Sequence, residues 1–264
     1  IEPDDSVNAL LRLRGLNDEE FVKSHYVVFA TKNGTVKKTS LEAYSRPRTN
    51  GVNAINIVEG DEVVDVRLTN GKNEIILANR NGRAVRFDED SIRTMGRVST
   101  GVRGMKLDDG DDQVVGMIVV NNAETETVMV VSENGYGKRS QVEDYRKTNR
   151  GGKGVKTFSI TEKTGRLVAI KNVTDDNDLM IINKSGTAIR LAVSECRVMG
   201  RATQGVRLIN LSKKNDVIAS VCKVMSTEKE AEVSGDKDDE DATPATDVQA
   251  TEAPQTETQT TETE

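Results

Sequence analysis

The residues best suited to chemistry form one short basic stretch, Arg146–Gly154. Its nine residues hold four positive charges and three glycines, with no acidic and no large apolar side chain. Glycine lets backbone N–H groups approach a ligand closely, and Arg and Lys side chains suit phosphate groups. The stretch predicts either a phosphate-binding loop or a solvated basic loop, and its place in the chain has to decide between the two.

Several other chemistries lack the residues they need. His25 is the single histidine, and Cys196 and Cys222 stand apart without a CxxC spacing. A His-based triad and a His- or Cys-rich metal site are therefore excluded, and lone cysteines are typical of a reducing compartment. We expect no catalytic residue, metal or cofactor in this chain. No signal peptide or long apolar run is seen, so we expect a cytoplasmic location.

The net charge of −6 averages two different regions of the chain. Residues 226–264 hold 13 acidic residues and two lysines, whereas residues 1–225 hold 35 basic residues against 30 acidic ones. The acidic region has too few apolar side chains to offset the entropy of ordering it. We predict a mildly basic folded domain at 1–225 and a disordered acidic tail at 226–264.

The chain repeats itself at intervals of about fifty residues, which is clearest at its hairpin glycines. Aligning Gly34, Gly82, Gly135 and Gly186 gives spacings of 48, 53 and 51 residues. Each follows Asn or Ser, a pair that favours a two-residue hairpin turn. Short runs of branched apolar residues precede the glycines and predict strands that are buried on both faces.

A second glycine closes each unit and is followed by Val. Apolar residues recur four and six positions after it, which is the period of a half-buried strand. These second glycines are Gly51, Gly101, Gly154 and Gly205. A further strand is expected before each hairpin, at 7–13, 63–68, 114–120 and 167–173.

Four strands per unit predict an all-β protein with propeller-like blades. The blades are expected at about 7–57, 63–107, 114–160 and 167–211. Residues 217–224 are a fifth copy of the opening strand. We interpret them as a closing strand whose partner blade lies upstream of Ile1.

Basic residues occupy fixed positions of this repeat. Arg stands eight and four positions before the second glycine in three units, and a basic residue stands four positions after the first glycine in all four. If rotation relates the units, equivalent positions fall on a ring and form a positive belt. Such a belt matches the phosphates of duplex DNA without reading its sequence. The alternative is that these side chains form an ordinary solvated face.

The predicted DNA contacts are the basic residues of these columns and their loops. They are Lys37, Lys38, Arg46, Arg48, Arg86, Arg93, Arg97, Arg103, Lys138, Arg139, Arg146, Lys147, Arg150, Lys153, Arg190, Arg197 and Arg201.

Several segments resemble the C-terminal domain of the DNA gyrase A subunit. Residues 150–154 resemble the end of the family's Gln-Arg-Arg-Gly-Gly-Lys-Gly box, and 33–39, 134–139 and 199–206 look like its other blades. The box-like copy lies in the third unit, with Thr148 and Asn149 where the full motif has Gln and Arg. The acidic tail is similar in kind to that of gyrase rather than of topoisomerase IV.

This resemblance implies a β-pinwheel of four-stranded blades, with four blades present of a ring that usually has six. It implies that the chain wraps double-stranded DNA around its rim and supports ATP-dependent negative supercoiling. The implied partner is the gyrase B subunit in an A2B2 assembly, with ATP and Mg²⁺ held by other domains or subunits. The chain itself is expected to be non-catalytic and its location to be the bacterial cytoplasm, on the chromosome.

Two other interpretations stay open. One is the C-terminal domain of the topoisomerase IV A subunit, and the other is a propeller scaffold that binds protein partners. An enzyme active site is the weakest alternative, because no acid–base or nucleophile constellation is present.

Overall fold

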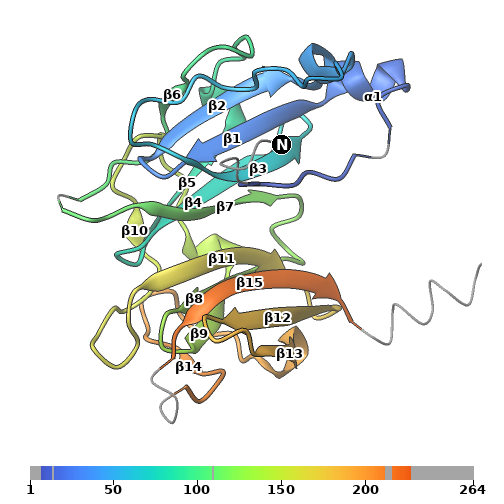
Figure 1. Cartoon of the computed structure of the whole chain (residues 1–264). Helices are drawn as coiled ribbons and strands as arrows, with labels where there is room; N and C mark the ends of the chain where they lie inside the picture. Colours follow the sequence, from blue (N-terminus) through green and yellow to red (C-terminus); the bar gives the residue numbers. More distant parts are fainter. Residues whose placement is uncertain (1–6, 14, 109, 212–215, 227–264) are drawn as a thin grey trace, which may run out of the picture. The chain divides into compact units, whose positions relative to one another are not determined.

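The computed structural model describes residues 7–13, 15–108, 110–211 and 216–226. Ile1–Ser226 is one compact unit, and most of its regular structure is β-strand (Figure 1). The predicted all-β fold class is therefore confirmed. The predicted disordered tail, apart from Ser226, lies outside the described residues.

The strands of the described part of the chain form four antiparallel sheets. The first sheet has the order β3 (Val63–Thr69), β1 (Tyr26–Thr31), β2 (Thr35–Ser40), β6 (Val102–Arg103). The second has the order β10 (Val155–Lys156), β5 (Arg83–Asp88), β4 (Glu74–Asn79), β7 (Val114–Val120). The third has the order β11 (Leu167–Val173), β8 (Thr127–Ser132), β9 (Tyr136–Gln141), β14 (Val206–Arg207). The fourth has the order β13 (Ala188–Ala192), β12 (Asn177–Asn183), β15 (Ile218–Met225).

Each of the first three sheets draws its strands from two successive units of the sequence repeat. In the first sheet β1 and β2 form the hairpin, while β3 pairs with β1 and β6 pairs with β2. Both β3 and β6 come from the second unit. The repeat unit and the sheet are therefore different divisions of the chain, contrary to our interpretation of one unit as one blade. This exchange fastens each sheet to the next.

The hairpins are present at all four glycines, but their turns differ from the expected two-residue type. The Gly34 amide donates to the Thr31 carbonyl at 3.0 Å, which makes glycine the fourth residue of the turn. Its φ of 84° is the left-handed conformation that follows a type I turn in a three-residue hairpin loop. The other hairpin glycines make the same bond. The hairpin prediction is confirmed and the two-residue turn is wrong.

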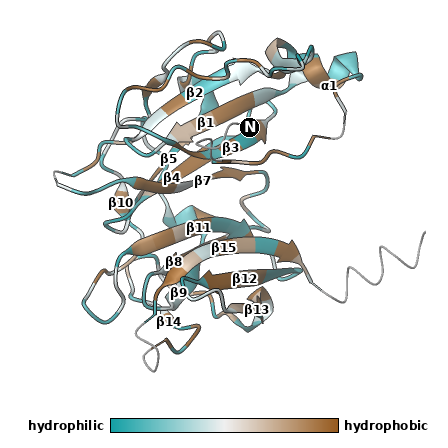
Figure 2. Ribbon diagram, viewed as in Figure 1, coloured by the Kyte–Doolittle hydropathy of each residue, from teal (hydrophilic) through white to brown (hydrophobic). Residues whose placement is uncertain are grey.

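One edge strand of every sheet faces the neighbouring sheet. β3, β7, β11 and β15 are these strands, and each contacts the next (Figure 1). Apolar side chains fill the space between sheets; one cluster joins Val28 and Val36 to Leu77 and Met117. In Figure 2 the hydrophobic colour lies mainly on the strands and the hydrophilic colour on the loops. The propeller-like arrangement of blades is confirmed.

The opening strands predicted at 63–68, 114–120 and 167–173 and the closing strand are present, but three details of the strand predictions differ. Residues 7–13 form no strand, and the chain enters β1 through helix α1 (Glu19–Ser24) instead. The strand after the second glycine is only two residues long in three units, and residues 51–57 form none. The closing strand β15 pairs with β12 of the fourth sheet, so its partner does not lie upstream of Ile1.

In the described residues, four 3₁₀ helices, which the sequence did not lead us to expect, begin the loops that carry the Arg columns. They are η1 (Leu41–Tyr44), η2 (Glu89–Ser91), η3 (Val142–Asp144) and η4 (Val193–Glu195). The first residue of each is buried, which anchors the start of each loop against a sheet.

Candidate nucleic-acid interface

The basic residues four positions after each hairpin glycine point into the protein. One guanidinium nitrogen of Arg86 donates hydrogen bonds to the carbonyls of Val142 and Tyr145, at 2.8 and 3.0 Å. Those carbonyls belong to η3 of the next unit and the residue after it. Glu74 binds the same guanidinium from within the second sheet. Arg86 therefore fastens one unit to the next.

Lys38 and Arg139 of the same column make corresponding contacts. The Lys38 ammonium donates to the Glu89 carbonyl at 3.0 Å, and Arg139 donates to the Cys196 carbonyl beside η4. The two basic residues are only 5% and 8% exposed. Their burial favours a structural role over the DNA contact that we predicted.

Two further predicted contacts, Lys37 and Lys138, are fully buried beneath the Arg-bearing loops. Lys37 donates to the carbonyls of Ala54 and Arg97, and Lys138 donates to the Gly200 carbonyl at 2.6 Å. Burial lowers the pKa of each ammonium to about 8. These side chains hold the loops from inside and are not accessible to a ligand.

The glycines of Arg146–Gly154 are used for close approach between chain segments. A Cβ on Gly154 would lie 2.2 Å from the Ala84 carbonyl oxygen, and its φ of 74° also favours glycine. The Gly151 amide donates to the Gly104 carbonyl at 2.6 Å. The loop is thereby packed against its neighbours, and the Gly151 N–H is already used within the protein.

The arginines four positions before the second glycine link one loop to the next. Arg150 donates to the carbonyls of Ser91 and Arg103, at 2.9 and 2.8 Å. Arg201 makes the corresponding bond to the Lys156 carbonyl at 2.7 Å. Both arginines remain half-exposed. Since a guanidinium has five N–H donors, each can hold its loop and still bind a phosphate oxygen.

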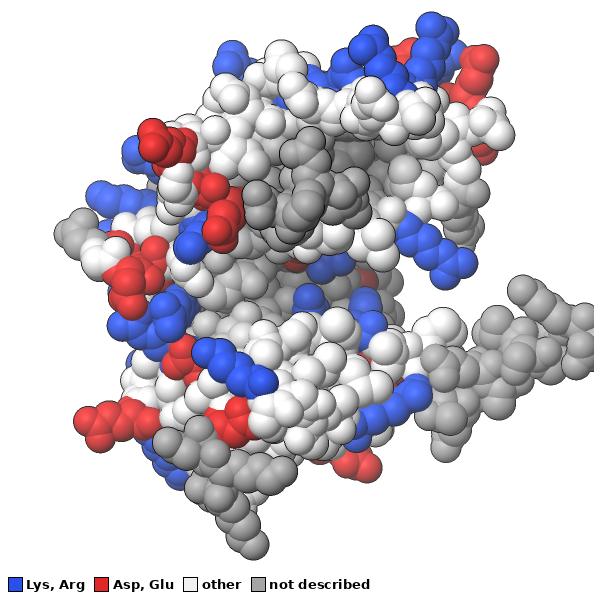
Figure 3. Space-filling view, in the orientation of Figure 1, with Lys and Arg blue, Asp and Glu red and all other residues white. Residues whose placement is uncertain are grey.

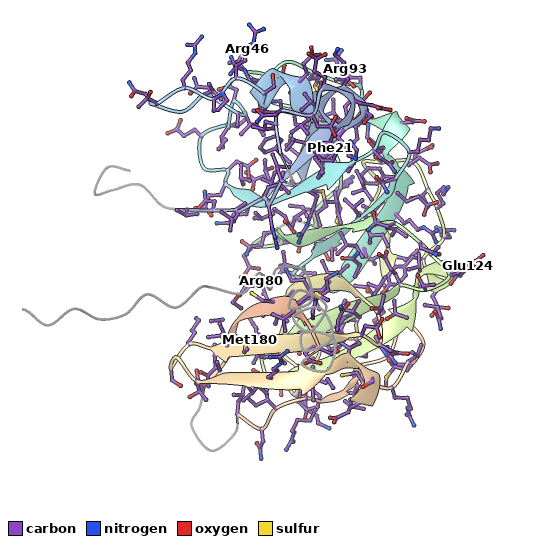
Figure 4. All side chains as sticks on the ribbon, turned by 90° about the vertical axis from the view of Figure 1, so that its right-hand side faces the viewer. Phe21, Arg46, Arg80, Arg93, Glu124 and Met180 are labelled. Carbon is purple, nitrogen blue, oxygen red and sulfur yellow. The ribbon has the colours of Figure 1, made fainter. Side chains whose placement is uncertain are left out.

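The most accessible basic side chains come from the position eight before the second glycine. Arg93, Arg146 and Arg197 are exposed, and none of their guanidinium groups has a hydrogen-bond or ion-pair partner among the described residues. The same holds for Arg46 and Arg48 of the first unit. In Figure 4, Arg46 and Arg93 are both labelled at the upper end of the protein. These guanidinium groups are free to bind phosphate.

An open concavity lies between the loops of the first and second units. Arg46, Arg48 and Arg97 line it, together with the single carboxylate of Glu42. Three guanidinium groups against one carboxylate give the concavity a net positive charge. Predicted contacts of two units thus line one concavity.

Three further predicted contacts are exposed but already have carboxylate partners. The pairs are Lys147 with Glu74 and Asp88, Lys153 with Asp108, and Arg190 with Asp178. Hydrogen bonds to Asp88 and Glu74 raise the pKa of Lys147. A phosphate would have to compete with these carboxylates, so the three are weaker candidates than the unpaired arginines.

Two exposed basic residues, Lys156 and Arg207, were not among our predictions. They stand two positions after the second glycine, where the predicted contact Arg103 stands in its own unit. All three lie on the short outer strands β10, β14 and β6 and are exposed. The signal was available, because aligning the second glycines places basic residues at this position in three of the four units.

Charge is not uniform over the surface. On the face shown in Figure 3, basic side chains gather along the upper edge, where the first sheet and its loops lie, and both signs alternate along the left edge. Among the described residues no group of three or more His, Cys, Asp or Glu side chains could hold a metal ion. In the same residues no helix has the length and apolar character needed to cross a membrane.

Repeated sheets that exchange strands, with unpaired arginines on their outer loops, define a propeller-like protein with a basic rim. A family model described as the DNA gyrase C-terminal domain, beta-propeller, matches residues 25–70, 73–121, 126–174 and 177–222. The chain belongs to this family, as the resemblance in the sequence predicted. Each matched segment holds a hairpin and the next opening strand, which agrees with the observed sheets rather than with our repeat units.

Relatives with known names support the same assignment. The DNA gyrase A subunit of Staphylococcus epidermidis is 43% identical over 224 residues, which are 85% of this chain and 24% of that protein. The corresponding protein of Staphylococcus aureus is also 43% identical, over 85% of this chain and 25% of its own length. The chain thus spans about a quarter of the length of these relatives.

Solved structures resemble the fold closely. The C-terminal domain of a DNA topoisomerase IV has a TM-score of 0.74 at 30% identity, over 84% of this chain and 69% of that one. A DNA gyrase A C-terminal domain also has a TM-score of 0.74, at 24% identity over 85% of this chain and 72% of that one. The topoisomerase IV domain is therefore as near in fold as the gyrase domain.

Proposed function

We propose that this chain binds duplex DNA along its outer rim without reading sequence, and that it bends the DNA around successive blades. The observation that carries the proposal is the recurrence of unpaired, exposed Arg93, Arg146 and Arg197 at equivalent positions. Duplex DNA carries one charge per about 1.7 Å whatever its base sequence. A row of such side chains can therefore contact the phosphates of any duplex.

Bending is the part of the proposal that needs several blades at once. Smoothly bending a site of about 20–30 base pairs costs on the order of 1–6 kcal/mol. One phosphate contact is too weak to offset this, whereas contacts from successive loops add up along the path. The half-exposed Arg150 and Arg201, which tie the loops together, keep those contacts at a fixed spacing.

Within a longer gyrase A chain, this wrapping would support ATP-dependent negative supercoiling by presenting a bent DNA segment to the enzyme. The gyrase B subunit would be the partner, and ATP and Mg²⁺ would bind outside this chain. The names of the curated relatives support this role. A corresponding role in topoisomerase IV is the second candidate, supported by the 30% identical solved domain.

The first test is the salt dependence of binding to random-sequence duplex, measured by fluorescence anisotropy. The logarithm of the affinity should fall linearly with the logarithm of salt, with a slope of about −0.9 per phosphate contacted. Replacing the three unpaired arginines, as Arg93→Glu, Arg146→Glu and Arg197→Glu together, should make that slope shallower by about 3.

The matched control replaces three exposed lysines outside the outer loops, as Lys72→Glu, Lys184→Glu and Lys223→Glu together. It carries the same change in net charge and should keep most of the salt slope. Equal loss in both variants would show that only net charge matters. Absence of DNA binding at low salt in the unmodified chain would reject the proposal in favour of a protein-binding scaffold.

A further inference from the structure

Each of the described outer loops begins with an exposed carboxylate that stands shortly before its exposed arginine. Three positions separate Asp90 from Arg93, and the other units keep this offset at two to four positions. The carboxylates belong to the 3₁₀ helices η1 to η4. These residues, which we call the acidic row, are Glu42, Asp90, Glu143 and Glu195. Exposed charges of both signs therefore recur in the same loops of successive units.

The acidic row does not pair with the arginines beside it. Among the described residues, none of its carboxylates has a hydrogen-bond or ion-pair partner, and neither has the Arg93 guanidinium. In the three later units a buried residue with extended backbone stands directly before the arginine; these residues are Ile92, Tyr145 and Cys196. Successive side chains of an extended chain point to opposite faces, so the arginine points outward. The two rows of opposite charge thus face solvent separately.

The acidic row lies at the side of the rim that is remote from the hairpin turns. Each 3₁₀ helix directly follows the second strand of a hairpin, so it lies at the far end of that strand. The short outer strands pair at the near end, as where Arg103 of β6 is opposite Thr35, the first residue of β2. The exposed basic residues of the outer strands and the acidic row therefore mark the two margins of each outer loop.

The basic band between these margins is narrow. Thr94, the residue after Arg93, bridges to Lys38, which lies three residues along β2 from Thr35. Three residues of a strand span about 10 Å. This is less than the width of one major groove of duplex DNA, about 12 Å. A duplex that lies along the band therefore extends past it on both sides, and on one side it meets the acidic row.

We propose that the acidic row borders the bound duplex and fixes one side of its path along the rim. The inference rests on the proposed DNA binding and names the residues that keep the DNA over the loops and the outer strands. An ionised carboxylate offers only hydrogen-bond acceptors, so it repels a phosphate group. At physiological salt this repulsion acts over about 8 Å. The acidic row therefore leaves distant DNA unaffected and opposes a sideways shift of bound DNA across it.

The experiment measures binding of the full chain to random-sequence duplex by fluorescence anisotropy over a range of salt. It changes the three later units, whose outer strands pair with sheets of this chain. The reversed row is Asp90→Lys, Glu143→Lys and Glu195→Lys together, and the neutralised row is Asp90→Asn, Glu143→Gln and Glu195→Gln together. None of these is the buried residue of its 3₁₀ helix. Circular dichroism of each variant establishes that it is folded.

The matched controls change three exposed carboxylates in turns outside the outer loops. They are Glu59→Lys, Glu124→Lys and Glu162→Lys together, and the same three residues replaced by Gln. The reversed row should make the salt slope steeper by about 3, because lysines beside the duplex gain phosphate contacts. The neutralised row should raise the affinity at low salt by at least about threefold, because it removes three repulsions. Both controls should change these quantities less.

Two outcomes would overturn the inference, and they are distinguishable. If the unmodified chain binds DNA but the row variants behave like their matched controls, the inference fails and the proposed DNA binding stands. The carboxylates would then lie away from the duplex, as on a surface that binds a basic protein. If the unmodified chain does not bind DNA at low salt, the proposed function fails and the inference fails with it.

Discussion

At the scale of single residues, the role of each arginine here depends on what surrounds its guanidinium. Arg86 lies between two carbonyls of the next unit and a carboxylate of its own sheet, and little of its side chain is exposed. Arg93 lies seven residues further along the chain, and its guanidinium has no partner among the described residues. The first residue holds sheets together, and the second is free for a ligand.

This contrast predicts opposite effects of the same substitution. Arg86→Ala should lower the free energy of unfolding by about 1–3 kcal/mol, because it leaves two carbonyls without their partner and Glu74 with Lys147 alone. Arg93→Ala should change it by no more than about 0.5 kcal/mol. Urea unfolding measures both values. DNA affinity, compared at conditions where each variant is folded, should fall only for Arg93→Ala; a fall for both would place Arg86 in the DNA site.

The repeat predicts which positions are equivalent, but it does not predict which way their side chains face. Lys38 and Arg146 are both basic residues beside small or polar neighbours, and sequence spacing treats them alike. Their difference arises because η2 brings a carbonyl and the Glu89 carboxylate to Lys38. The 3₁₀ helices that create such partners are too short to leave a periodic signal in the sequence.

At the scale of elements, the pairing of the opening strands is the feature that sequence reasoning missed. The alternating apolar pattern of residues 63–69 is equally compatible with pairing to the hairpin before it and to the hairpin after it. The choice is made by packing: β3 pairs along the whole of β1, with a register shift between Ala30 and Thr31. The same shift recurs where β7 meets β4. A local pattern predicts that a strand exists, whereas its partner depends on contacts distant in the sequence.

The loops themselves alternate between two kinds of anchor. Three positions after the hairpin glycine stand Lys37 and Lys138 in the first and third units, but Val85 and Ile189 in the second and fourth. The buried ammonium groups donate hydrogen bonds to loop carbonyls, whereas the apolar side chains of Val85 and Ile189 cannot donate a hydrogen bond. In the first and third units, therefore, the loop is held by a buried charged side chain.

This arrangement predicts a pH dependence of stability with a definite sign. Burial lowers the pKa of Lys37 and Lys138 from 10.5 to about 8 in the folded chain. Between these values the unfolded chain binds more protons than the folded chain, so this contribution makes stability rise as the pH increases from about 8 to 10.5. The Lys37→Met, Lys138→Met double variant should lose that contribution. Urea unfolding across this pH range checks it, and an unchanged pH slope in the variant would contradict it.

At the scale of the whole molecule, the exposed arginines act through their arrangement along successive units. Arg46 belongs to the first unit and Arg197 to the fourth, while Arg93 and Arg146 lie in the units between them. The basic excess of residues 1–225 is small, at 35 basic against 30 acidic residues. Attraction by net charge alone is therefore modest, and in the proposed wrapping the regular placement of a few unpaired side chains supplies the contacts that bend DNA.

The position of an arginine along the row of units predicts how much its replacement changes the bending of bound DNA, even where the change in charge is equal. Arg46→Glu with Arg197→Glu removes the first and last contacts of the described row of unpaired arginines, where the DNA has a neighbouring contact of the row on one side only. Arg93→Glu with Arg146→Glu removes interior contacts, which have neighbours on both sides. Both pairs should make the salt slope shallower by about 2. Energy transfer between dyes at the two duplex ends should fall mainly for the end pair. An equal fall for both pairs would mean that the DNA crosses the rim without following it.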